Sequence, residues 1–380
     1  MQTLLEPNKK TTLVVDGNWL LISRQFVMRD IFKKELPIEY LERSSYKLAD
    51  MMCQSISTTL RLFRGLITNV VLVADNKSWR RDIPKPPCMQ GVEYKGNREF
   101  ESNTDWNYVW KAMDILIDRL NAFGMTTCRL YGIEGDDWCW WWSRKLNAQG
   151  INVITWTSDN DVKQLIQKDN DTGAWTGWYE KSKGLYLNEK CKCGVEPENL
   201  FDSFMSPITQ QDSSISKFTK VVSVTYYNPA EIVNSKIFIG DEGDNIRPTF
   251  TYKKGEKTYK MTLKDLTGLI NIEDGNYNEI DWEKTLNYIY KNILLKKKSG
   301  LKNSTNITTE KEFIEHVIYN RQMVWINEKM IPDYIQEQMS QVEYKQLSHQ
   351  VMYDMMMNWK SMATESDSDV SSLVLDEMFG

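Results

Sequence analysis

Short apolar runs that end in acidic residues recur along residues 12–245, and they constrain the fold of this chain more than any other feature. Most of the runs are rich in Val, Ile or Leu, and longer stretches with helical periodicity separate them, which predicts a mainly parallel α/β sheet flanked by helices. The carboxyl ends of parallel strands meet at one edge of a sheet, so the acids that follow them should converge there. These acids are Asp16, Asp75, Glu134, Asp136, Asp137, Asp159, Asp161, Asp241 and Asp244.

The same two patterns predict where the elements lie. Apolar runs predict strands at 12–16, 70–75, 125–130, 151–156 and 221–226, and a hairpin formed by 175–179 and 184–187. Helical periodicity predicts helices at 40–66, 105–123, 138–147 and 229–239. We therefore expect a core at 1–262, with a basic arch at 76–104 and a longer irregular segment at 168–220, then a helical C-terminal subdomain at 263–364 and an acidic disordered tail at 365–380.

The composition limits the chemistry that the acids can perform. His316 and His349 are the only histidines, which argues against histidine catalysis and favours oxygen ligands, and therefore Mg²⁺ or Mn²⁺ over Zn²⁺. The six cysteines are scattered, which indicates no disulfide framework and a reducing, cytoplasmic setting. We expect no membrane span, because no apolar run is long enough, and no signal peptide, because the N-terminus lacks a charged region.

The net charge of −5 belongs to the C-terminal tail. Residues 365–380 hold five acids and no Lys or Arg, so residues 1–364 carry balanced charge. If metal ions neutralise the clustered acids, the rest of the surface is net basic, and a nucleic-acid partner is compatible with the composition.

A single acid at the end of an element is commonly a cap or a turn residue. Matching placements at five points along the chain are better explained by a shared divalent-cation site. Two Mg²⁺ ions about 3.5–4 Å apart require several carboxylates, and they can clamp the attacking and leaving oxygens of a phosphodiester. Such ions also generate a nucleophilic water without histidine.

The motifs around these acids resemble those of the phage and bacterial 5′-nuclease family, which shares its fold with flap endonucleases. Their order and spacing match across about residues 10–250. Within the family, Asp75–Asp82 resembles the T-even phage ribonuclease H branch, whose members are 5′→3′ exonucleases that remove RNA primers. The matching motifs are Val15-Asp16-Gly17-Asn18, Val73-Ala74-Asp75-Asn76, Glu134-Gly135-Asp136-Asp137, Ser158-Asp159-Asn160-Asp161 and Gly240-Asp241-Glu242-Gly243-Asp244-Asn245-Ile246.

The resemblance implies a PIN-like 5′-nuclease core that uses two Mg²⁺ ions, with Mn²⁺ as a substitute. It implies exonuclease, flap endonuclease and RNase H activity on 5′-ended or branched DNA and RNA–DNA duplexes, in the host cytoplasm if the chain is phage-encoded. Asp136 and Asp159 are the acids expected to be essential for catalysis. One ion would be held by Asp16, Asp75, Glu134 and Asp136, the other by Asp159, Asp161, Asp241 and Asp244, with Asp137 near both.

The arch carries a further resemblance, because Glu93–Arg98 is similar to the phosphate-steering motif of the family. Lys95 and Arg98 would lie on one helical face at i and i+3, next to Tyr94, and would stabilise the scissile phosphate. Basic residues earlier in the arch would guide the strand; these are Lys77, Arg80 and Arg81. From charge alone a solvated basic loop would be the better interpretation, and the order Tyr-Lys-Gly-Asn-Arg is what favours the steering motif.

The chain departs from the family after the last acidic motif, because it lacks the Gly-x-Gly helix–hairpin that binds duplex DNA. A lysine-rich stretch follows instead, and its cations can contact duplex phosphates without reading sequence. The lysines are Lys253, Lys254, Lys257, Lys260 and Lys264.

The C-terminal tail resembles the clamp-binding tails of T-even phage replication proteins. A few apolar residues follow an acidic, Ser-rich linker, and such a peptide can dock in a pocket of a sliding clamp. A frayed terminus is the alternative. A single-stranded-DNA-binding protein is a second expected partner. The apolar residues are Leu373, Leu375, Met378 and Phe379.

Two other features have plain structural interpretations. The tryptophans at 138 and 140–142 are expected to pack a helix against the sheet rather than to stack on bases. Cys191 and Cys193 have no second Cys or His pair nearby, so we expect a loop rather than a zinc site. Two alternative functions stay open: a PIN-like endoribonuclease and a branched-DNA-binding protein without catalysis.

Overall fold

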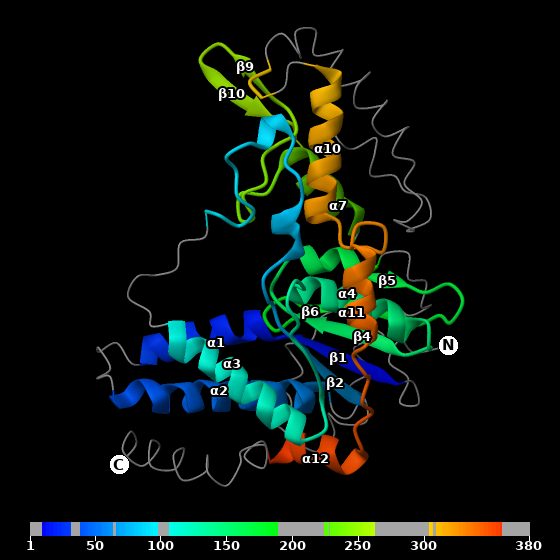
Figure 1. Ribbon diagram of the computed structural model, residues 1–380. Helices are drawn as coiled ribbons and strands as arrows, with labels where there is room; N and C mark the ends of the chain where they lie inside the picture. Colours follow the sequence, from blue (N-terminus) through cyan, green and yellow to red (C-terminus); the bar gives the residue numbers. More distant parts are fainter. Residues whose placement is uncertain are drawn as a thin grey trace.

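A sheet of mainly parallel strands forms the centre of the protein (Figure 1). This computed structural model describes residues 10–31, 39–63, 66–97, 106–188, 224–227, 229–262, 304–306 and 309–358. Within them the strand order of the sheet is β3-β2-β1-β4-β6-β7-β8, and β5 pairs with β6. The bounds are Thr11–Asp16 (β1), Asn69–Val73 (β2), Thr126–Cys128 (β3), Asn152–Trp156 (β4), Gln167–Lys168 (β5), Trp175–Glu180 (β6), Gly184–Asn188 (β7) and Val224–Tyr227 (β8).

The expected α/β class is confirmed by the pairing. Neighbouring strands from β3 to β6 are parallel, as are β7 and β8, whereas β6 is antiparallel to both β7 and β5. Every residue of β1, β2 and β4 is buried. Along β1, Leu13 and Val15 pack against the helices of one face, and Val14 packs against the other face. Burial on both faces explains why these strands are almost continuously apolar in sequence.

Helices cover both faces of the sheet (Figure 1). One face packs against α1 (Gly17–Ile31), α2 (Glu39–Phe63), α3 (Trp106–Ala122) and α12 (His349–Met357). The other face packs against α4 (Gly135–Asn147) and α11 (Asp333–Ser340). The strands and helices expected from the sequence agree with these bounds to within a few residues, except that α4 begins earlier, at Gly135, because Asp136 and Asp137 form its acidic first turn.

The tryptophans of α4 are core residues, which confirms their expected role. Trp138, Trp140 and Trp142 are buried, and Trp141 is half-buried beside them.

A third apolar cluster lies beyond the edge of the sheet, at the upper end of the molecule in Figure 1. It is formed by α7 (Pro229–Ile239), α10 (Glu310–Val324), the short 3-10 helix η2 (Pro87–Met89) and the loop that follows α7. The hairpin β9 (Thr251–Lys254) and β10 (Lys257–Lys260) projects from it. Gly255, with φ of 66°, allows the tight turn of this hairpin, which the sequence analysis did not anticipate.

The basic segment after β2 is more folded than the extended arch that we expected. In its described part, 76–97, it forms η1 (Trp79–Asp82), η2 and a turn, and it connects the sheet to the third cluster. Met89, Val92 and Tyr94 are buried in that cluster, which anchors the segment. Residues 98–104, and with them Arg98, lie outside the described residues.

The C-terminal part returns to the start of the chain. The Tyr344 hydroxyl lies 2.7 Å from Oγ1 of Thr12, and the side chain of Asn69 bonds both the Lys345 carbonyl and the Leu347 amide. Helix α12 then packs on α2. The described residues 309–358 are largely helical, as expected, but their helices join all three apolar clusters, so the boundary at 262 stays a prediction.

Several expectations concern residues outside the described ranges. These are the tail at 365–380 with Leu373, Leu375, Met378 and Phe379, the pair Cys191 and Cys193, and Lys264. Within the described residues, no helix is both long and apolar enough to cross a membrane.

The docking of α12 predicts that the C-terminal part contributes to the stability of the sheet core. Met355 is fully buried, so Met355→Ala should lower the free energy of unfolding by about 2–5 kcal/mol. Met357 on the same helix is 61% exposed, so Met357→Ala should change it by less than about 0.5 kcal/mol. Urea denaturation followed by tryptophan fluorescence measures both, and equal effects would contradict the docking.

Candidate metal centre

The first acid of the site is fixed at the carboxyl end of β1. Asp16 accepts hydrogen bonds from the Trp19 amide at 3.0 Å and from the Thr157 hydroxyl at 2.7 Å. Gly17 must follow it, because a Cβ there would lie 2.9 Å from the Val73 carbonyl oxygen. The strand end and the helix start therefore set the direction of the carboxylate.

The second acid, Asp75, lies beside it at the end of β2. Its Oδ1 accepts the Gly135 amide of α4 at 2.6 Å, and its own amide donates to the Asn18 side chain at 2.9 Å. A Cβ on Gly135 would lie 3.0 Å from Oδ1 of Asp75 and 3.9 Å from Oδ1 of Asp16. A side chain at position 135 would therefore press on Oδ1 of Asp75, and glycine lets α4 begin close to this carboxylate without displacing it.

The start of α4 separates three adjacent acids into two different roles. Glu134 and Asp137 point into a buried ion-pair network, whereas Asp136 faces the pocket with Asp16 and Asp75. Successive helical residues are about 100° apart around the axis, so neighbouring acids cannot share one direction.

Arg80 is the centre of the buried network. Its guanidinium donates to Glu134 at 2.7 Å and to Asp137 at 2.8 Å, and its Nε donates to the Met323 carbonyl at 3.1 Å. Arg80 is 2% exposed and Asp137 is not exposed. The structure thus corrects two expectations: Asp137 does not lie with the metal-facing acids, because Arg80 engages both of its oxygens, and Arg80 is not on the surface where it could guide a strand.

Glu134 lies between this network and the pocket. It also accepts the Ser78 hydroxyl at 2.7 Å and the Lys95 ammonium at 2.5 Å. Burial works to raise the pKa of Glu134, but Lys95 and Arg80 outweigh it and hold the pKa at about 2. Glu134 is therefore a permanently charged carboxylate whose oxygens already have cationic partners.

The remaining acids of this pocket repel one another. Burial, followed by the charge of Asp75, raises the pKa of Asp16 to about 7. Burial and the charge of Asp159 raise the pKa of Asp136 well above its ordinary value, although Lys95 works to lower it. We call Asp16, Asp75, Asp136 and Asp159 the first carboxylate group. Their mutual repulsion is the electrostatic condition that a divalent cation would relieve.

An open pocket of about 920 Å³ joins this group to cations and aromatic rings. The cations on its lining are Lys77, Arg81, Lys95 and Arg129, and the aromatic residues are Trp19, Phe26, Trp106 and Trp110. Lys77 and Arg81 are exposed, as a role in strand contact requires. The sequence analysis did not identify Arg129, which follows β3, or the aromatic residues, which lie on α1 and α3, because their local pattern explains them as ordinary surface or core residues.

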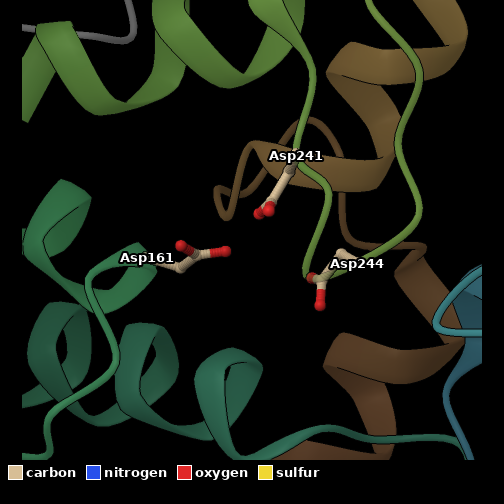
Figure 2. A group of neighbouring side chains, drawn as sticks. All are labelled: Asp161, Asp241 and Asp244. Carbon is tan, nitrogen blue, oxygen red and sulfur yellow. The ribbon is translucent and has the colours of Figure 1, made fainter. Parts of the chain in front are cut away.

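The second carboxylate group is Asp161, Asp241 and Asp244 (Figure 2). Among the described residues, these three bring one oxygen each within 4.8 Å of one another, so they could hold a metal ion. Asp161 lies in η3 (Asp161–Leu165), and the other two lie in the loop after α7. Asp159 connects the two groups, because its Oδ1 accepts the Asp161 amide at 2.8 Å.

The segment that carries Lys95 docks on that loop. The Lys95 amide donates to the Asp244 carbonyl at 3.0 Å, and the Asn245 side chain donates to the Glu93 carbonyl at 2.8 Å. Lys95 has a φ of 55° in a turn, so it does not continue the helical face that its spacing from Arg98 suggested. Tyr94 is buried, with its hydroxyl 3.3 Å from Glu134, so it supports the acids rather than presenting a surface.

The basic hairpin is exposed and projects at the upper end of the molecule in Figure 1. Lys253 and Lys254 on β9 and Lys257 on β10 are all exposed, which suits contact with phosphates. Lys260, also on β10, makes an ion pair with Glu242, with 3.5 Å between Nζ and Oε1.

The raised pKa values predict an unusual pH dependence for the metal-free protein. The native state keeps a proton on Asp16 up to about pH 7, whereas the unfolded chain loses it near 3.8, so this group destabilises the fold as pH rises through that window. Asp16→Asn should therefore gain stability over the wild type between pH 5 and pH 8 in EDTA, measured as a widening difference in Tm. Burial lowers the pKa of His316 to about 4, which gives an opposite trend, but it is common to both proteins and cancels in the difference.

Saturating Mg²⁺ should remove most of that difference, because a bound cation compensates the charge of Asp16. A Tm difference that is constant with pH would contradict the raised pKa of Asp16.

No model of a protein family and no curated protein matches the chain. Among solved structures, bacteriophage T5 D15 protein co-crystallised with metal ions is 15% identical, with 93% of this chain and 100% of that chain covered and a TM-score of 0.46. The T5 D15 flap endonuclease in a complex with DNA and metal ions is also 15% identical, with 93% of this chain and 99% of that chain covered and a TM-score of 0.44. Human GEN1 in complex with Holliday junction DNA is 13% identical, with 99% of this chain and 74% of that chain covered and a TM-score of 0.40. At these values the similarity concerns overall shape, and we take no residue role from these proteins.

Proposed function

We propose that this protein is a metal-dependent nuclease that hydrolyses phosphodiesters at 5′ ends and 5′ flaps. The observation that supports it best is the first carboxylate group, in which acids from the ends of three parallel strands and the start of α4 line one open pocket together with four cations. Carboxylates that repel one another beside cations suit a site for a divalent ion and a phosphate.

The residues present fit Mg²⁺ or Mn²⁺. Every candidate ligand is a carboxylate oxygen, and the described residues around the pocket offer no histidine. When bound, such an ion lowers the pKa of a water molecule and offsets charge on the phosphate. Of the protein's own groups, Asp16 and Asp75 would hold it from the strand ends, and Asp136 and Asp159 would close the site.

The cations and aromatic rings account for the nucleic-acid part of the proposal. Lys95 lies at the inner side of the pocket beside Glu134, where its ammonium could contact a phosphate without contacting a base. Lys77 and Arg81 would hold neighbouring phosphates of the strand. The rings of Phe26, Trp106 and Trp110 suit unpaired bases, which stack on aromatic faces irrespective of sequence.

The finer assignment is removal of RNA primers by a 5′→3′ exonuclease with flap endonuclease and RNase H activity. It rests on the resemblance of Asp75–Asp82 and of the acidic motifs. A 5′-labelled flap substrate, in DNA and in RNA-primed form, incubated with Mg²⁺ or with EDTA, tests it. Cleavage of single-stranded RNA alone would favour the PIN-like endoribonuclease, and tight binding without cleavage would favour the non-catalytic alternative.

The role of the first carboxylate group predicts a defect in rate rather than in affinity. Asp136→Asn should lower single-turnover cleavage by about 10³-fold or more, because loss of the cation removes several kcal/mol of transition-state stabilisation. Binding of the flap should stay within about threefold, because the removed charge repels DNA. Asp171→Asn removes an exposed acid from the turn before β6 and serves as the matched control. Equal rates in the two variants would remove the first group from the mechanism.

The exposed hairpin predicts a contribution to duplex binding that depends on salt. Lys253→Ala combined with Lys257→Ala should flatten the plot of log K against log salt by roughly two units, because about one counterion is released for each phosphate contact. Fluorescence anisotropy with a labelled duplex measures the slope. Lys168→Ala combined with Lys181→Ala removes two exposed lysines, one on β5 and one in the turn between β6 and β7, and should leave the slope unchanged. If both pairs behave alike, the duplex does not contact the hairpin.

A further inference from the structure

Lys236 lies inside the second carboxylate group. It is in the last turn of α7, and its ammonium makes ion pairs with both Asp161 and Asp241. The three side chains are largely buried, with 17%, 14% and 19% exposure, respectively. The sequence analysis assigned the two acids to a second metal ion and did not consider this lysine.

Each of the two acids is held in place independently of the lysine. The Asp241 loop is closed by reciprocal backbone hydrogen bonds with Ile246, and Oδ1 of Asp241 accepts the Gly243 amide at 2.9 Å. The Asp161 amide is bonded to Asp159. Helix α7 is anchored by Val233 and Ile237 in the third cluster. The lysine and its two partners therefore lie on three elements whose backbones are held by other contacts: α7, η3 and the loop after α7.

The two carboxylate groups differ in their compensating charge. The first group is spread around the pocket, and burial, followed by the charges of the other acids, raises the pKa values of Asp16 and Asp136. The second group is drawn to within 4.8 Å, although carboxylates that close together repel strongly without a cation. Lys236 supplies that cation and, despite burial, holds the pKa of Asp241 below its ordinary value. It also works to lower the pKa of Asp161, but burial and the charge of Asp159 outweigh it and raise that pKa to about 7. The close approach of Asp161 and Asp241 is thus explained by the lysine and does not require a metal ion.

We infer that Lys236 is a built-in cation of the second carboxylate group: its ammonium occupies the place between Asp161 and Asp241 that a second divalent ion would need. The protein then binds one divalent ion strongly, at the first group, and a second ion only when Lys236 is displaced. This inference rests on the proposed function and deepens it, because it changes the expected metal content from two tightly bound ions to one, with the lysine ammonium in place of the second.

Counting bound Mn²⁺ tests the inference without any cleavage assay. The electron paramagnetic resonance signal of free Mn²⁺, measured during titration of metal-free protein, gives the number of sites and their affinities. We expect one strong site in the wild type. Lys236→Met should show two, with the second at least tenfold tighter than any second site of the wild type, because the competing positive charge is gone.

Three variants control the interpretation. Lys236→Arg keeps the charge and should behave as the wild type, as should Lys181→Met, which removes an exposed lysine from the β6–β7 turn. Lys236→Met combined with Asp241→Asn should lose the gained site. Lys236→Gln replaces Lys236→Met if circular dichroism shows that the methionine variant is not folded.

Two results would overturn the inference. One is a wild type that binds two Mn²⁺ with affinities within threefold of each other, and the other is a folded Lys236→Met or Lys236→Gln that gains no site. Other results would contradict the proposed function rather than this inference. A wild type without any strong site would remove the first group as a metal centre, and a correct count without cleavage of the flap would remove the nuclease activity alone.

Discussion

The buried ion-pair network around Arg80 is the interaction on which the rest of the site depends. One guanidinium joins the segment after β2 to the first turn of α4 through Glu134 and Asp137, and to α10 through the Met323 carbonyl. Burial works to lower the pKa of Arg80, but its two carboxylate partners raise it well above the ordinary value, so the charge persists. Removing the guanidinium would leave two buried carboxylates uncompensated, which is far more costly than losing an exposed pair. The network therefore fixes the direction of α4 and, with it, the position of Asp136.

Charge compensation then divides the remaining acids. Glu134 has Arg80 and Lys95, and Asp241 has Lys236, so their pKa values are lowered. The pKa values of Asp16, Asp136 and Asp161 are instead raised by burial and by other acids. A cluster of acids in a sequence does not reveal this division, because most of the compensating ion pairs join distant segments. Arg80 is 57 residues from Asp137, and Lys236 is 75 residues from Asp161. The negative charge of the first group is not compensated in this way, so an external cation would bind in the pocket that this group lines.

The third apolar cluster gives this arrangement its rigidity. It holds α7 with Lys236, the loop with Asp241 and Asp244, and the turn with Lys95 in one packed unit. Lys95, which pairs with Glu134, and Lys236, which pairs with the second carboxylate group, are thus supported by the same core. A ligand that moved one of these segments would also move the other, because well-packed interiors transmit such displacements.

The sequence alone determined the class of the fold and the identity of most acids at the site. Apolar runs that end in acids predict parallel strands, and parallel strands bring their carboxyl ends together whatever the details of packing. Burial of the α4 tryptophans also followed from composition, because large apolar surface is rarely left in water. Only the tertiary structure decided which acids face the pocket. Asp136 and Asp137 are neighbours with the same chemistry, but helical geometry turns one toward the pocket and the other toward Arg80. Lys95 and Tyr94 likewise took their roles from contacts between remote segments, as did Lys236 in its ion pair with Asp161, and such contacts leave no local pattern in a sequence.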